Sequence, residues 1–178
     1  ADGVRALPAP LHATLWVIAV ATMTMGNVLA VLQTSLKRIL AYGTVSQLGF
    51  LVVLFGAGTA EATVAGVTLL LAHAMFKAGL FLVVGIVDHQ AHTRDIRSLG
   101  AYGPGWAAPR SIAVLLGASM AGIPLLFGFV AKELAYESWY HGELAGSAVV
   151  LVGIVAGSVL TFAYTARLLL GAFRPGVP

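Results

Sequence analysis

The sequence predicts an all-α, polytopic membrane helix bundle with five transmembrane helices, the fourth of them discontinuous. Three observations predict this fold class. Hydrophobic residues make up 59% of the 178 residues and charged residues only 10%, whereas a soluble domain carries about 25% charge. Five apolar stretches each approach the roughly 20 residues that a spanning helix needs. One of these stretches is interrupted by a proline between two glycines.

Composition also limits the function. The pI near 9.5 could indicate a nucleic-acid partner, but the basic residues are scattered singly or in pairs, so we expect none. There are no cysteines, hence no disulfide framework and no cysteine metal site. No nucleophile triad, P-loop or dinucleotide fingerprint occurs, so we expect neither an enzyme nor a cofactor. Because the chain lacks an initial methionine and a signal peptide, we expect a segment of a longer protein or a processed piece.

The first two predicted spans cover residues 15–33 and 39–58, and Lys37 and Arg38 lie between them. The first half of the second span is unusually polar. Tyr42, Ser46 and Gly49 share one helical face there. This face could serve interhelical hydrogen bonding, which is common in membrane bundles, or a hydrated path leading away from Lys37. The sequence leaves both open. The polar residues of this half are Tyr42, Thr44, Ser46 and Gln47.

The third predicted span, residues 63–87, carries His73 and Lys77 near its centre. Residues four apart share a helical face, with Cβ atoms about 6 Å from each other. A lysine at this depth costs about 2.5–3.5 kcal/mol on insertion scales, and ionisable residues inside membranes commonly mark ion pathways. A lysine that extends to the interface is the alternative, but that works best near a helix end. We therefore predict a functional pair.

A polar loop from Gln90 to Gly105 follows the third span. Asp88, His89 and His92 stand close together there. Because no other ligand cluster lies within reach in the sequence, we expect exposed loop residues and no metal site.

The fourth predicted span, residues 111–140, contains Gly122, Pro124 and Gly128. Proline removes a backbone donor and clashes with the preceding turn, so the helix should break here. Breaks at membrane depth often mark ion sites. Lys132 and Glu133 follow the break directly. The alternative is a helix that ends at residue 131, with Lys132 at the interface.

The fifth predicted span covers residues 144–173, where Gly153 and Gly157 should admit a close neighbouring helix. With five spans, basic residues gather on one side of the membrane. This side should be cytoplasmic, so the N-terminus should lie outside and the C-terminus inside. The basic residues of that side are Lys37, Arg38, Arg94, Arg97, Arg110, Arg167 and Arg174. The opposite side carries Arg5 with Asp2, Glu61, Glu137 and Glu143.

Three motifs resemble those of the antiporter-like membrane subunits found in respiratory complex I, membrane-bound hydrogenases and Mrp-type sodium/proton antiporters. They are QTSLKRILAYGTVSQLGF (residues 33–50), LLAHAMFKAGLFLVVGIVDH (residues 70–89) and SMAGIPLLFGFVAKE (residues 119–133). The stretch VDHQAHTRDIRSLG (residues 87–100) looks most like the A-type subunit of the Mrp antiporter. The resemblance implies a fold of two inverted five-helix repeats. It identifies residues 1–178 as the second repeat, with the first repeat absent.

The resemblance also implies roles for single residues. Lys37, His73, Lys77 and Lys132 match the family's proton-carrying positions, supported by Tyr42, Thr44, Ser46, Gln47 and Glu133. Two departures stand out. Gly43 replaces a usual serine, which removes a hydroxyl from the path, and Leu69 replaces the second histidine of some relatives.

The function expected from this resemblance is that of a cell-membrane subunit of a sodium/proton antiporter. It would move protons along buried lysines and a histidine, because translocation needs groups that change protonation. Expected partners are other membrane subunits, the absent first repeat, the lipid bilayer, protons and sodium. Two alternatives remain: a proton-pumping subunit of a respiratory or hydrogenase complex, and a structural subunit that conducts nothing.

Overall fold

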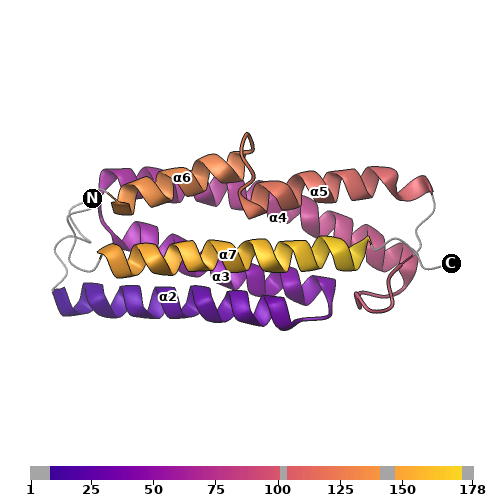
Figure 1. Cartoon of the computed structure of the whole chain (residues 1–178), viewed down its shortest axis with the longest axis horizontal. Coiled ribbons are helices and arrows are strands. Elements are labelled where there is room, and N and C mark those ends of the chain that lie inside the picture. Colours follow the sequence, from indigo (N-terminus) through magenta and orange to yellow (C-terminus); the bar gives the residue numbers. More distant parts are fainter. Residues whose placement is uncertain (1–8, 101–103, 141–146, 174–178) are drawn as a thin grey trace.

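The structure, a computed structural model, describes residues 9–100, 104–140 and 147–173. Within these ranges the chain is a bundle of helices laid along one long axis (Figure 1). This arrangement confirms the predicted all-α membrane fold. The elements are α2 (Ala9–Leu32), α3 (Leu36–Gly56), α4 (Ala60–Ala91), the 3-10 turn η1 (Pro104–Trp106), α5 (Ala107–Ala121), α6 (Phe127–Tyr140) and α7 (Ser147–Ala172).

Four of these helices, α2, α3, α4 and α7, are long and apolar enough to cross a bilayer. Helix α5 has 15 residues and α6 has 14, so each is too short to cross alone. The two follow one another along the same side of the bundle, end to end (Figure 1). They form the discontinuous fourth span that Gly122, Pro124 and Gly128 predict.

Several helices extend beyond the approximate bounds of the predicted spans. Helix α3 begins at Leu36, so Lys37 and Arg38 belong to its first turn rather than to a preceding loop. Helix α4 runs on to Ala91, past the predicted end at residue 87. Asp88 lies within the helix and pairs with Arg94 at 2.7 Å. The left-handed residue His92, with φ of 50°, ends the helix.

Helix α3 occupies the middle of the bundle, in contact with α2, α4 and α7. Its closest approach is to α2. A Cβ on Gly49 would lie 2.7 Å from the Met23 backbone nitrogen, and one on Gly26 would lie 2.7 Å from the Ser46 nitrogen. Glycine at these positions lets two backbones pack almost in contact. Gly153 and Gly157 admit α2 as well, against Val20 and Met23.

The loop after α4 closes one end of the bundle. The amide of Leu36 donates to the Arg94 carbonyl at 2.9 Å, and the amide of Ile96 donates to the Thr34 carbonyl at 2.9 Å. Arg167 on α7 donates from Nε to the Gln33 carbonyl at 3.1 Å. These bonds hold the α2–α3 turn, the loop and the end of α7 together.

Candidate functional site

Lys77 lies in the middle of α4 with only 4% of its surface exposed. Its Nζ donates to the carbonyl of Leu40 on α3 at 3.0 Å. The ion pairs among the described residues are Arg94–Asp88 and Arg97–Asp95, both near the loop end of the bundle. The ammonium of Lys77 is therefore held without a carboxylate.

Gly43 provides the space for this ammonium. A Cβ on residue 43 would lie 2.8 Å from Lys77 Nζ and 2.9 Å from the hydroxyl oxygen of Tyr164 on α7. The ring of Tyr164 also faces the charge, with its centroid 5.6 Å from Nζ. The sequence presents Gly43 as a missing hydroxyl, and the structure places the lysine head in that space.

His73 is buried one turn before Lys77 on α4, with 8% of its surface exposed. Its ring meets Phe76 edge to face at 5.4 Å, and its Nδ1 has no hydrogen-bond partner in the described part of the chain. Gln47 on α3 is also buried, and its Oε1 likewise lacks a partner there. Helices α3 and α4 run antiparallel with Gly43 beside Lys77, so one turn along each places Gln47 at the level of His73.

Lys132 lies on α6 just beyond the helix break, with 5% of its surface exposed. Its Nζ donates to the Ala121 carbonyl at the end of α5, at 2.9 Å. A cation is favourable there, because the last carbonyls of a helix lack partners and carry partial negative charge. Lys132 is therefore buried within the bundle rather than exposed on its surface. Glu133 points outward and is exposed.

Gly122 forms the C-cap of α5 with φ of 87°, a left-handed conformation. The amide of Gly128 donates to the Ser119 hydroxyl across the break at 3.1 Å. The helical ladder is thus interrupted between residues 121 and 127, as predicted. The connection projects from the bundle near the middle of its long axis (Figure 1).

The remaining predicted residues are less central. Lys37 is exposed in the first turn of α3, one turn from Leu40. Thr44 donates to the carbonyl of Leu40 in its own helix at 3.0 Å. Tyr42 is half-buried, and Ser46 is buried on the side of α3 that packs against α2. Lys77 and His73 thus lie one turn apart on α4, whereas Lys132 bonds to the end of α5 and Lys37 is exposed at the start of α3.

Sequence reasoning missed a second polar group, which joins α2 to α7. Asn27 is fully buried, and its Nδ2 donates to the Gly157 carbonyl at 2.9 Å. Thr161 donates to the same carbonyl at 2.9 Å. A signal was present: Thr161, Tyr164 and Thr165 recur at helical spacing within an apolar span. A search for charged residues alone overlooks it.

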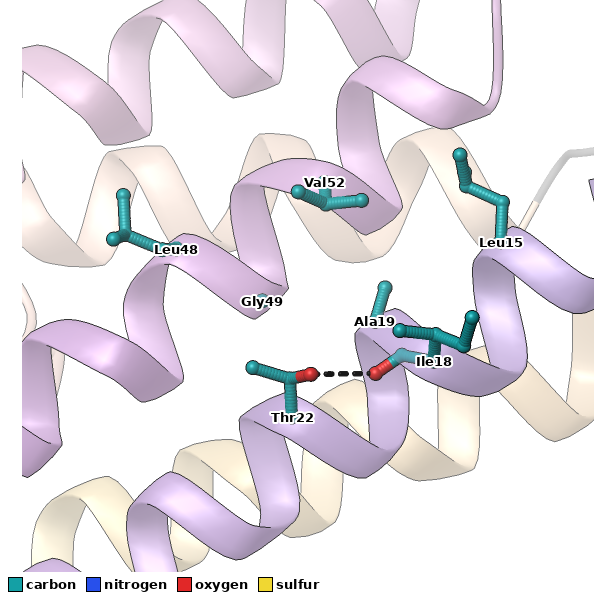
Figure 2. Close-up of a pocket in the computed structure, with 7 residues that line it drawn as sticks. All are labelled: Leu15, Ile18, Ala19, Thr22, Leu48, Gly49 and Val52. Atoms are coloured by element: carbon teal, nitrogen blue, oxygen red, sulfur yellow. Dashed lines mark hydrogen bonds between the residues drawn. The ribbon is translucent and has the colours of Figure 1, made fainter.

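The groove between α2 and α3 offers no ion site (Figure 2). It has a volume of about 230 Å³. Thr22 supplies its polar side chain, and that hydroxyl already donates to the Ile18 carbonyl at 2.7 Å. The lining residues are Leu15, Ile18, Ala19, Thr22, Leu48, Gly49 and Val52. In the described ranges no three His, Asp or Glu side chains gather as a metal site would require.

Several known proteins are similar to this chain in sequence and in fold. The A-type subunit of the Na(+)/H(+) antiporter from Bacillus subtilis is 38% identical over 180 residues, covering 89% of this chain and 22% of the relative. A probable K(+)/H(+) antiporter A/B subunit from Rhizobium meliloti is 37% identical over 167 residues, covering 91% of this chain and 17% of that relative. The chain therefore spans about a fifth of the length of the curated relatives it matches.

Solved structures agree. A chain of the Mrp complex from Dietzia sp. DQ12-45-1b has a TM-score of 0.81 and 39% identity, over 89% of this chain and 18% of that one. A chain of respiratory complex I from Thermus thermophilus has a TM-score of 0.85 at 22% identity. The match covers 96% of this chain and 36% of that one, and it shows a shared fold. A family model described as "NADH:quinone oxidoreductase/Mrp antiporter, TM" matches residues 8–161. The chain thus belongs to the NADH:quinone oxidoreductase/Mrp antiporter family of multi-pass membrane proteins.

Proposed function

We propose that this chain is the second five-helix repeat of a monovalent cation/proton antiporter subunit, and that it conducts protons. The observation that carries the proposal is the burial of Lys77 at mid-helix beside His73, with a carbonyl rather than a carboxylate as its partner. An intramembrane lysine is costly and is usually kept for ion movement. A lysine without a paired acid can release its proton without leaving an unpaired carboxylate behind.

The proposed path enters at the exposed Lys37, continues through Lys77 and His73, and reaches Lys132 at the helix break. Tyr42, Thr44, Ser46, Gln47 and Glu133 are its supporting polar groups. Each group that gains or loses a proton changes the field at its neighbours, since charges interact strongly where water is scarce. Gln47 Oε1 and His73 Nδ1, buried and unpartnered in the described part of the chain, would bind water in such a path.

The exchanged cation is proposed to be sodium, with potassium as the other candidate. The relatives' names give sodium for one and potassium for another. The proposed partners are the first repeat, other membrane subunits and the surrounding lipid. Identity of 39% to the Mrp chain, against 22% to the complex I chain, favours an antiporter over a redox-driven pump.

Replacement of Lys77 by leucine tests the proposal. If Lys77 carries protons, Lys77→Leu in the full-length protein should abolish cation/proton exchange in vesicles, while complex abundance stays normal. A structural subunit predicts otherwise, because removing an unpaired buried charge is neutral or stabilising. Val83→Leu, a matched change at a buried apolar position on α4, should leave exchange intact. Normal exchange in Lys77→Leu would refute the relay.

A further inference from the structure

Tyr164 is a fully buried residue on α7 that the proposed path does not use. Its hydroxyl lies near the Thr161 side chain but makes no well-aligned hydrogen bond within the described part of the chain. A tyrosine hydroxyl buried in a bundle usually finds a partner. Its orientation therefore needs a reason other than a hydrogen bond of its own.

The orientation of Tyr164 is explained by the group that its ring faces, the ammonium of Lys77. Lys77 Nζ is 5.6 Å from the ring centroid, within the roughly 6 Å over which an aromatic face attracts a cation. The hydroxyl and Nζ both lie within 3 Å of the point where a Cβ on Gly43 would stand. The absence of a side chain at residue 43 thus lets α7 reach the charge of α4 across α3.

Neutral groups surround this charge. The carbonyl of Leu40 accepts its one hydrogen bond, and the described ion pairs lie elsewhere. A carbonyl and an aromatic face stabilise the ammonium, yet neither takes its proton at working pH. These partners can position the charged form of Lys77 and still leave it able to lose its proton.

We propose that Tyr164 is a positioning residue for Lys77, whose ring holds the ammonium in the space beside Gly43. This inference rests on the proposed function of Lys77. Several titratable or charged groups lie on α4 and on the elements packed against it. They are Lys37, Arg38 and Tyr42 on α3, Arg110 on α5, Lys132, Glu133, Tyr136, Glu137 and Tyr140 on α6, and Glu61, His73, Asp88 and His89 on α4 itself. Lys132 is bonded to Ala121, and Lys37, Arg110 and Glu133 are exposed.

The test is the pH profile of cation/proton exchange by the full complex in vesicles. Tyr164→Leu removes the aromatic face, so the charged form of Lys77 loses support. The alkaline limb of the profile should then move to lower pH by about one unit. Tyr164→Phe keeps the face and should leave the limb within about 0.3 unit of its original position. A merely structural tyrosine would change abundance or maximal rate but not this limb.

Gly43→Ala provides a second variant should Tyr164→Leu fail to assemble. Its Cβ would lie 2.8 Å from the ammonium and 2.9 Å from the Tyr164 hydroxyl. It would therefore push the charge and the ring apart, and the limb should move in the same direction. Gly85→Ala is the matched control on α4, because nothing lies within 4 Å of a Cβ there. An unmoved limb in Gly43→Ala, or an equal shift in Tyr164→Phe and Tyr164→Leu, would overturn the role of Tyr164. Normal exchange in Lys77→Leu would instead overturn the proposed function itself.

Discussion

Charged residues have different partners in the centre and at the loop end of the bundle. Lys77 and Lys132 each donate to a backbone carbonyl, whereas Arg94 and Arg97 pair with carboxylates. A lysine bound to a carbonyl keeps the option of losing its proton. An arginine paired with an acid stays charged at any working pH. The proposed function therefore requires proton transfer in the centre only, with a fixed structure at the loop end.

Asp95 allows this distinction to be tested. The side chain and backbone amide of Arg97 donate to its carboxylate and hold its pKa at about 2, below the ordinary 3.8. A lowered pKa gives stabilisation that is complete above about pH 4 and is lost as the pH falls through about 2. Asp95→Ala should speed hydrogen–deuterium exchange in residues 92–100 yet leave the pH profile of transport between about pH 6 and 9 unchanged. A shifted profile would mean that the loop acid takes part in transport.

At the scale of an element, the discontinuous helix depends on one backbone conformation. Gly122 has φ of 87°, and the non-glycine residue Leu125 also adopts a positive φ of 73°. Left-handed conformations cost non-glycine residues about 1–2 kcal/mol. The break is therefore built into the sequence at Gly122 and is reinforced by Pro124. The same conformation brings the end of α5 to the head of Lys132.

Gly122→Ala should destabilise this element. The new Cβ would meet Lys132 Cδ at 2.9 Å in addition to the strained φ, so we expect a loss of about 1–3 kcal/mol. Gly85→Ala, in open space within α4, should be neutral or stabilising by up to about 1 kcal/mol. The melting temperature of the purified complex measures the effect of each substitution on stability. Equal melting temperatures would show that the break tolerates an ordinary residue.

At the scale of the whole molecule, basic residues of the described chain gather at the loop end. Arg94 and Arg167 lie there, in segments that hydrogen bonds join to the turn before α3, and Lys37 follows in the first turn of that helix. The positive-inside rule therefore predicts that this end faces the cytoplasm. The opposite end holds Glu61 and Glu137. The residues of the same argument that lie outside the described ranges are Arg174, Arg5, Asp2 and Glu143.

Cysteine labelling tests this orientation, since the chain has no cysteine of its own. Ser98→Cys, in the exposed loop after α4, should resist impermeant reagents added to intact cells and react in inverted vesicles. Ser147→Cys, at the start of α7, should show the opposite pattern. Labelling of residue 98 from outside intact cells would reverse the orientation.

The sequence predicted the number of crossings and the break, because apolar length and a Gly–Pro–Gly pattern depend only on local chemistry. The end of α4 could not be predicted that way, since the helix continues beyond its apolar part to the left-handed His92. Lys77 and His73 were found because charge is rare in such spans. Tyr164 and Asn27 were not, because their roles depend on how α7 and α2 are rotated against α3, which local patterns do not specify.

The proposed function depends on reversible protonation of Lys77. Replacement by arginine tests it most directly, because arginine preserves a cation at this position but stays protonated at any working pH. The measurement is cation/proton exchange by the Lys77→Arg complex in vesicles, scaled to complex abundance. We predict an assembled complex whose exchange is abolished, as in Lys77→Leu. Exchange at the original rate in Lys77→Arg would contradict the relay, because a permanent charge would then suffice.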